Sequence, residues 1–306
     1  MEPDDTLIRT RSKPASPNGT QSSGRTASGR CCPNTSDKPP TESPRYPQNV
    51  DLNGKVIVIT GGGSGIGAGM ARRFAKERPA GLVVADIDLD AASAVAGETG
   101  GVAVFCDVSN PSDNEALIGG AEERFGPIDV FCANAGIGMV GDEQSDPATW
   151  DRMWSINLMS HVHAARLLIP GWVARGEGYL LVTASAAGLL TNLKAAQYSV
   201  TKHAAVAFAE WLAVTYGDAG VRVSALCPQF VNTPLLHGSE SFKALGANHT
   251  LEPEDVADAV VSGLKEERFL ILPHPEVEKY FQNKANDYDR WIGGMRKLQR
   301  SVFPEP

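Results

Sequence analysis

The stretch KVIVITGGGSGIG, residues 55–67, indicates the fold of this chain. Its first half is a short apolar run rich in β-branched residues, which favours a buried strand. Its second half is a glycine-rich loop that leads into a helical stretch. Glycine allows a tight turn and close approach of the backbone to a ligand, and a helix N-terminus offers free N–H groups with partial positive charge. The combination predicts a diphosphate site, although a glycine cluster alone is also compatible with a plain turn.

Six further apolar runs follow and alternate with helical stretches. They are continuous rather than alternating in polarity, as expected for parallel strands covered on both faces. The predicted strands are 55–60, 81–86, 101–107, 128–133, 178–184, 221–227 and 268–272, and the predicted helices include 65–78, 110–126, 148–176 and 195–216. This order predicts an α/β fold of the Rossmann type, with a doubly wound, seven-stranded parallel sheet flanked by helices on both faces.

Composition divides the chain into three parts. Residues 1–50 are rich in Pro, Ser, Thr and Gly and nearly lack aliphatic side chains, which predicts a disordered low-complexity tail. A further hypothesis is that this tail is a start-site artefact, because domain-like sequence begins abruptly after it. Residues 51–273 are predicted to form the catalytic domain, and residues 274–306 a C-terminal helical extension.

The overall composition excludes several classes of partner. A net charge of −8 argues against nucleic acid, and no apolar run approaches the roughly 20 residues that cross a bilayer. The five cysteines show neither metal-ligand spacing nor a disulfide framework. We therefore expect no metal site and no membrane segment, and buried reduced thiols at Cys106, Cys132 and Cys227 in a cytoplasmic protein.

Asp86 ends the second predicted strand, about 20 residues beyond the glycine loop. A carboxylate at this place can accept hydrogen bonds from both ribose hydroxyls of a dinucleotide and would repel the 2′-phosphate of NADP. Neither the loop nor the residues after Asp86 offer an Arg or Lys to that phosphate. The sequence therefore predicts NAD(H), with a strand-end cap as the alternative interpretation of Asp86.

The stretch AAQYSVTKHAA, residues 195–205, places Tyr198 and Lys202 on one face of a predicted helix. Alone, the pair is compatible with an ordinary exposed helix face. At roughly 4 Å and an effective dielectric of about 20, an ammonium stabilises a phenolate by about 4 kcal/mol. That is enough to lower the phenol pKa by up to about 3 units, so Tyr198 is expected to act as a general base near neutral pH.

Five motifs in register resemble the short-chain dehydrogenase/reductase family over roughly residues 51–273. They are TGGGSGIG (60–67), CANAG (132–136), Asn157, Ser185 and YSVTK (198–202). The resemblance implies four catalytic residues, Ser185, Tyr198, Lys202 and Asn157, of which Asn157 would hold a water in a proton relay. It also implies a set of cofactor-binding residues: Thr60, Gly61, Ser64, Gly65, Ile66, Gly67, Asp86, Asp107, Val108, Asn134, Ala135, Gly136, Tyr198, Lys202, Pro228, Val231 and Thr233.

By the same resemblance the protein is an NAD-dependent oxidoreductase that interconverts a secondary alcohol and a ketone. Tyr198 would serve as general acid/base, while Ser185 would orient the substrate oxygen. Two alternatives remain open: a catalytically idle NAD-binding protein on the same fold, and an epimerase or dehydratase that does not consume NAD. One departure concerns Gln229, because the family usually has glycine after Pro228, which bears on the backbone shape beside the nicotinamide.

The substrate pocket and the assembly are less sharply defined. Pocket residues are expected at Ile137, Met139, Val140, Leu189, Leu190, Asn192, Leu235 and Leu236, a mainly apolar set that favours a hydrophobic or alicyclic alcohol or ketone. Segment 233–250 is predicted to be a mobile lid. Small residues on the helices at 148–175 and 195–216 predict a homodimer or homotetramer: Ala164, Ala165, Ala204, Ala205, Ala207 and Ala209. The histidines His161, His163 and His203 are interpreted as packing or surface residues.

Overall fold

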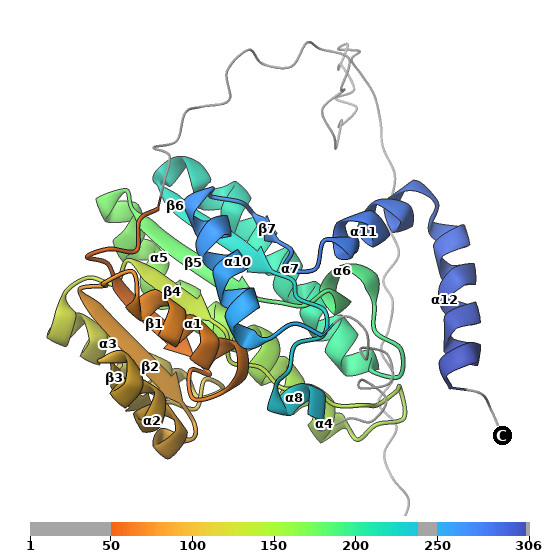
Figure 1. Ribbon diagram of the computed structural model, residues 1–306, viewed down its shortest axis with the longest axis horizontal. Helices are drawn as coiled ribbons and strands as arrows, with labels where there is room; N and C mark the ends of the chain where they lie inside the picture. The colour runs from red at the N-terminus through yellow and green to blue at the C-terminus, as the bar shows by residue number, and fades with distance from the viewer. Residues whose placement is uncertain (1–49, 238–249, 304–306) are drawn as a thin grey trace, which may run out of the picture. The chain divides into compact units, whose positions relative to one another are not determined.

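The computed structural model describes residues 50–237 and 250–303. The predicted tail, including Cys31 and Cys32, and most of the predicted lid lie outside the described residues. The seven predicted strands form one parallel sheet of order β3-β2-β1-β4-β5-β6-β7, as expected (Figure 1). Their bounds are β1 Val56–Thr60, β2 Gly81–Asp86, β3 Val102–Phe105, β4 Val130–Ala133, β5 Gly178–Thr183, β6 Val221–Leu226 and β7 Leu270–Ile271.

The strand order reverses between β1 and β4, which lie next to each other in the sheet. From β1 the chain winds outward through β2 to β3, and then it returns to β4 and continues in the opposite direction to β7. The loops that leave β1 and β4 therefore diverge at the carboxyl edge of the sheet. Such a topological switch point is where open α/β sheets bind their ligands.

Helices cover both faces of the sheet because successive strand residues point to opposite sides. In β1, Val56 and Val58 enter one buried cluster, and Ile57 and Ile59 enter the other. The first cluster is closed by α3 (Pro111–Phe125), α5 (Ser160–Arg175) and α7 (Ala196–Tyr216). The second is closed by α1 (Gly65–Ala75), α2 (Leu89–Thr99) and α10 (Pro253–Lys265), and α1 and α10 lie side by side in Figure 1.

The two edge strands are shorter than the apolar runs predicted. Run 101–107 forms a strand only over Val102–Phe105, and run 268–272 only over Leu270–Ile271. An edge strand has one neighbour, so it ends where the pairing with that neighbour ends. Strand β7 pairs only with Ala225 and Leu226 of β6, and the Phe105 side chain at the end of β3 is 52% exposed.

The long middle helix predicted at 148–176 is interrupted. It consists of α4 (Pro147–Trp154), a π-helical turn (Ser155–Met159) and α5. π-helical turns are rare in proteins, and those that occur often lie at functional sites. This one carries Asn157, one of the residues that the family resemblance singles out.

Two helices follow the last strand, α11 (Glu276–Asn286) and α12 (Tyr288–Val302). Helix α11 packs against the short helix α6 (Ala187–Leu190), and α12 packs against α11. Another short helix, α8 (Pro234–His237), begins the segment that was predicted to be a lid. In the part of the chain that the structure describes, no helix has both the length and the apolar character needed to span a membrane.

Candidate active site

A cleft of about 760 Å³ opens at the carboxyl edge of the sheet. Its walls come from the loops after the first six strands, from α4 and the π-helical turn, and from α7. Most of the predicted site residues line it: Gly61, Ser64, Gly65, Ile66, Asp86, Asp107, Val108, Asn134, Ala135, Gly136, Ser185, Tyr198, Lys202, Pro228, Val231 and Thr233. The tertiary structure therefore brings together residues that are spread over about 170 positions of the sequence, at the switch point of the sheet.

Three predicted site residues, Thr60, Gly67 and Asn157, lie behind the wall of the cleft rather than in it. Thr60 is buried, and its hydroxyl accepts hydrogen bonds from the backbone amides of Asn134 at 3.0 Å and Ala135 at 3.2 Å. A Cβ on Gly67 would stand 2.0 Å from the carbonyl oxygen of Gly61. These positions shape the wall: Thr60 joins β1 to β4, and Gly67 allows α1 to pack closely on the glycine loop.

The glycine loop presents bare backbone to the cleft. Gly61 and Gly65 have φ of 63° and 50°, in the left-handed region that favours glycine. A Cβ on Gly61 would lie 2.8 Å from the Cα of Ala135. Ser64 precedes α1 as its N-cap, and its side chain makes no capping hydrogen bond. The loop therefore brings glycine backbone and the free N–H groups of the α1 N-terminus to the cleft, an arrangement that fits a diphosphate.

Asp86 is held in place at the end of β2. Its two carboxylate oxygens accept hydrogen bonds from the backbone amides of Gly63 at 2.9 Å and Asp88 at 3.0 Å. Each oxygen keeps capacity for a further donor, such as a ribose hydroxyl. The basic side chains in the lining are Arg152 on α4 and Lys202 on α7, and neither belongs to the loops after β1 or β2.

Asn134, from the CANAG motif, joins the ends of three neighbouring strands. Its side-chain amide donates to the Thr60 carbonyl at 3.0 Å and accepts from the Thr183 hydroxyl at 3.0 Å. The motif thus fixes the carboxyl ends of β1, β4 and β5 relative to one another. This matters for the site because Ser185 follows β5 and the glycine loop follows β1.

Ser185, Tyr198 and Lys202 converge at the centre of the cleft. Tyr198 and Lys202 lie one turn apart on α7, and their side chains are 9% and 4% exposed. The Lys202 ammonium donates to the Thr183 carbonyl at 2.9 Å and stands 5.7 Å from the centroid of the Tyr198 ring. The Ser185 hydroxyl accepts from the backbone amide of Ala187 at 3.1 Å and lies beside the phenol.

The expectation that Lys202 lowers the pKa of Tyr198 is wrong, because the pKa of the phenol is raised. Burial raises the pKa of Tyr198, and the hydrogen bond with Ser185 offsets only part of this increase. Burial also lowers the pKa of Lys202 to about 8. The physical reason is that removal from water disfavours the charged form of both groups, while the ammonium bonds to a carbonyl instead of the phenol. The phenol is therefore protonated at neutral pH and suited to donate a proton.

Asn157 supports the loop after β4 from the π-helical turn. Its amide accepts from the Ile137 backbone N–H and donates to the Ile137 carbonyl, both at 2.9 Å, and it donates to the Thr201 hydroxyl at 3.2 Å. The adjacent Gly136 leaves room for the lysine, because a Cβ there would lie 3.2 Å from the Lys202 Nζ. The water-holding role of Asn157 stays a prediction, while its structural role is clear from these bonds.

The histidines differ in their surroundings. His161 is 1% exposed, and its Nε2 has no hydrogen-bond partner within the described ranges. Burial and the nearby Lys202 lower the pKa of His161 to about 3, so the ring is neutral. His203 is half-buried and its Nδ1 lies 2.8 Å from the carbonyl oxygen of Ser199. Among the described residues, no three His, Cys, Asp or Glu side chains are grouped to hold a metal ion.

The substrate end of the cleft is mainly apolar, as predicted, but two expected residues are not part of it. Ile137, Met139, Val140, Asn192, Leu235 and Leu236 line the cleft. Leu189 and Leu190 do not, because α6 turns them into the core, where they are 4% and 6% exposed. The lining also includes Arg152, Ile156, Gln229 and Phe230, which the sequence did not single out as pocket residues.

Gln229 does not distort the loop after β6. Its backbone is not in the positive-φ region, so the position does not require glycine. Arg152 and Ile156 could have been predicted from the sequence, since they stand four residues apart in the predicted helix that approaches the cleft.

The three described cysteines are free and buried, as expected, and burial raises the pKa of Cys106 and of Cys227 to about 12.

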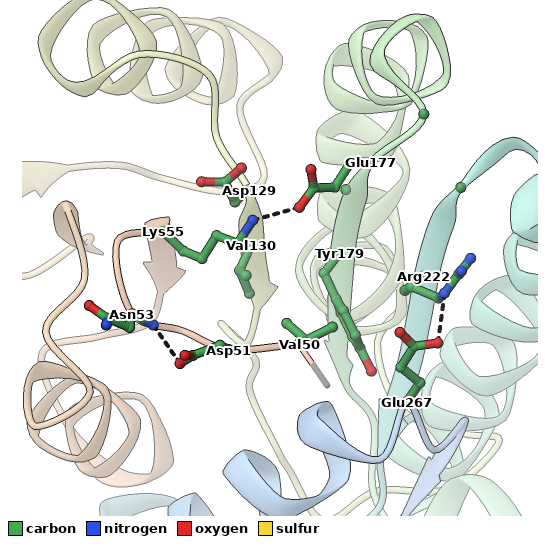
Figure 2. Close-up of a pocket in the computed structure, with 13 residues that line it drawn as sticks. Val50, Asp51, Asn53, Lys55, Asp129, Val130, Glu177, Tyr179, Arg222 and Glu267 are labelled. Carbon is green, nitrogen blue, oxygen red and sulfur yellow. Dashed lines mark hydrogen bonds and ion pairs between the residues drawn. The ribbon is translucent and has the colours of Figure 1, made fainter. Parts of the chain in front are cut away.

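A second hollow, of about 420 Å³, lies at the opposite, amino edge of the sheet (Figure 2). There the Lys55 ammonium pairs with Glu177 at 2.5 Å, and the Arg222 guanidinium pairs with Glu267 at 2.9 Å. The Tyr179 hydroxyl is buried against the Ser224 hydroxyl at 2.6 Å. Four of the charged groups that line this hollow are thus paired across neighbouring elements.

Comparison with known proteins agrees with the geometry of the cleft. Residues 55–244 match the family model described as short chain dehydrogenase. The chain is 34% identical over 251 residues to 1-deoxy-11-beta-hydroxypentalenate dehydrogenase of Streptomyces exfoliatus, covering 79% of this chain and 90% of the relative. It is 32% identical over 219 residues to the cyclohexanol dehydrogenase of an Acinetobacter species, covering 68% and 87%.

A solved structure has a fold similar to that of this chain. It is a short chain dehydrogenase/reductase from Burkholderia phymatum in complex with NAD, 30% identical in sequence with a TM-score of 0.72. The similarity covers 78% of this chain and 96% of that protein.

Proposed function

The chain belongs to the short-chain dehydrogenase/reductase family, and from this premise we propose how its cleft works. The protein is an NAD-dependent oxidoreductase that interconverts a secondary alcohol and a ketone. The observation that carries the residue assignment is the convergence of Ser185, Tyr198 and Lys202 in the cleft that also holds the glycine loop and Asp86.

Tyr198 is the general acid/base of this proposal. A nicotinamide cofactor held by the glycine loop, Asp86 and Lys202 would supply the hydride chemistry of this reaction. Tyr198 gives its proton to the ketone oxygen during reduction and takes one from the alcohol during oxidation. The pKa raised by burial suits the donor role, and the positive charge of an oxidised nicotinamide bound in the cleft would favour the phenolate needed for oxidation.

Ser185 and Lys202 support this proton transfer. The Ser185 hydroxyl lies beside the phenol, where it can orient the substrate oxygen and share its developing charge. Lys202 is fixed by the Thr183 carbonyl at 2.9 Å, which leaves further ammonium hydrogens for a ribose hydroxyl. Asp86 selects NAD over NADP, because its fixed carboxylate would repel a 2′-phosphate.

A hydrophobic, alicyclic alcohol or ketone is the substrate class that fits the cleft best. The wall beyond Tyr198 is formed by apolar side chains from the segments after β4 and β6, including Met139, Phe230 and Leu235. Few polar groups lie among them, so the substrate is held mainly by apolar contact and oriented at its oxygen. The relative named cyclohexanol dehydrogenase supports this class of substrate.

A homodimer or homotetramer is also part of the proposal, although only two of the six alanines named from the sequence are open to solvent, Ala207 (exposed) and Ala204 (half-buried). Ala164, Ala165, Ala205 and Ala209 are buried within the chain. Instead, α7 presents an outward apolar stripe in which Val200, Trp211 and Val214 are 46%, 55% and 80% exposed. Their spacing keeps them on one helix face, which suits a second subunit. The free buried cysteines support a reducing, cytoplasmic location.

A panel of secondary alcohols and ketones, followed at the absorbance of NADH, tests the proposed function. Turnover of alicyclic members with NAD(H), and slower turnover of small polar members, is the expected result. Absence of turnover across the panel, with NADH still bound, would instead favour an idle nucleotide-binding protein. Turnover without any change of NADH absorbance would favour epimerase or dehydratase chemistry.

A further inference from the structure

Two buried polar side chains connect the segment after β7 to loops of the cleft. His274 lies directly before α11, and Lys284 lies within it. They are 2% and 6% exposed. A buried imidazole or ammonium is costly unless it is hydrogen-bonded, so the partners of these groups show what their burial achieves.

His274 holds two consecutive backbone groups of the loop after β6. Its Nδ1 accepts from the Gln229 N–H at 3.1 Å, and its Nε2 lies 3.1 Å from the Phe230 carbonyl oxygen. A ring nitrogen that accepts carries no proton, so the neutral ring carries its proton on Nε2 and donates to that carbonyl. Gln229 and Phe230 both line the cleft, between Pro228 and Val231.

Lys284 holds the turn that follows Ser185. Its ammonium donates to the Leu189 carbonyl at 2.7 Å, near the end of α6. The last carbonyls of a helix lack intrahelical donors, and a buried α6 needs such a partner. The start of this turn is built on Ser185, whose carbonyl accepts from the Gly188 N–H at 2.8 Å. Lys284 therefore closes the short segment that begins at Ser185 and leads to Asn192 in the lining.

We propose that His274 and Lys284 are positioning residues for the two sides of the reacting centre. His274 sets the loop beside the nicotinamide, and Lys284 sets the substrate-side turn behind Ser185. This inference rests on the proposed function, because it takes the loop after β6 to be the nicotinamide loop. None of the described residues of the extension, 274–303, lines the cleft, so the extension acts on the site through these two residues.

The two anchors predict different losses. Because His274→Leu removes two backbone hydrogen bonds at the cofactor loop, it should weaken NADH binding about ten-fold or more. His274→Gln keeps one acceptor and one donor and should restore most of that binding. Lys284→Met keeps the length of the side chain but loses the donor, so it should leave NADH binding within about two-fold and lower kcat/KM for the alcohol about ten-fold.

Three measurements on the full-length protein separate positioning from general destabilisation. NADH fluorescence gives cofactor affinity without turnover, and steady-state kinetics give KM and kcat for both substrates. Hydrogen exchange should show faster exchange at 228–231 in His274→Leu, and at 186–192 in Lys284→Met, with the rest of the sheet unchanged. If His274→Leu fails to fold, His274→Asn is used, which is polar but too short to reach both backbone groups, and it should show the same loss.

The outcomes are distinguishable. Wild-type protein that does not bind NADH would overturn the proposed function and this inference with it. Wild-type binding with unchanged affinity in His274→Leu or His274→Asn would overturn the inference alone. Equal losses of cofactor and substrate affinity in both variants would also overturn it, since they would indicate a general loosening of the fold.

Discussion

The two edges of the parallel sheet are both hollowed and both polar, yet their polar groups are satisfied in different ways. At the amino edge, Lys55 pairs with Glu177 and Arg222 pairs with Glu267 (Figure 2). At the carboxyl edge, the Lys202 ammonium is buried and pairs with no carboxylate of residues 50–237 or 250–303, and burial shifts the pKa of both Lys202 and Tyr198. The amino edge has paired charges with some exposure to water, and the carboxyl edge has desolvated groups aimed at an open cleft.

The difference teaches that charge and volume alone do not mark an active site. Exposed paired charges such as Lys55 and Glu177 stabilise a fold little, and their pKa values carry no sign of a reacting centre. Desolvated groups with shifted pKa values cost stability, and they persist where a function requires them. Each of the following predictions tests whether the carboxyl edge carries the function and the amino edge contributes only to stability.

The largest effect on activity is expected for Tyr198, and the other buried tyrosine, Tyr179, serves as its comparison. Because Tyr198→Phe removes the proton donor, it should lower kcat/KM about a thousand-fold while NADH still binds. Tyr179→Phe removes the buried bond to Ser224 at the other edge, and should cost about 1 kcal/mol of unfolding free energy with activity retained. Similar activities for the two variants would contradict the assignment of Tyr198.

The second-largest effect is expected in the pH dependence of the unfolding free energy, measured without added cofactor. Burial lowers the pKa of Lys202 from its ordinary 10.5 to about 8. Between these values the unfolded chain binds one proton more than the folded chain, so stability from this group rises with pH. Relative to Lys202→Met, the wild type should gain up to about 3 kcal/mol of unfolding free energy across this window. Urea unfolding of both proteins at several pH values checks this; a constant difference would refute it.

A smaller effect is expected at Asp86. Because Asp86→Ala removes the carboxylate at the ribose, it should raise KM for NAD by about ten-fold and narrow the preference over NADP. The Asp86 carboxylate also holds the Gly63 amide, so the variant Asp86→Asn, which keeps an acceptor without the charge, is the control. An unchanged NAD/NADP ratio of kcat/KM in both variants would show that Asp86 does not select the cofactor.

The smallest effect is expected for Lys55→Met at the amino edge. Its partner Glu177 is 63% exposed, so breaking the pair should cost less than about 1 kcal/mol and leave kcat/KM unchanged. Thermal unfolding and the NADH assay measure both quantities. A loss of activity with normal stability would break the comparison, because it would give the amino edge a functional role.

Much of the site was predictable because its parts are local in sequence. The glycine loop, Asp86 and the pair Tyr198 and Lys202 each depend on short-range geometry: a strand–turn–helix, a strand end and one helical turn. Continuous apolar runs likewise predicted the seven strands. The short edge strands were not predictable, since their ends depend on how far a neighbouring strand extends.

What the sequence by itself determined is which residue types stand at the carboxyl ends of the strands. Only the tertiary structure decided which of them face the cleft and how burial shifts their pKa values. Thr60 and Asn157 turn into the wall, Leu189 turns into the core, and the Tyr198 phenol keeps a raised pKa although a lysine stands one turn away. The physical reason is that burial is a property of the assembled layers. Desolvation and long-range anchors such as His274 arise only when segments far apart in sequence pack together.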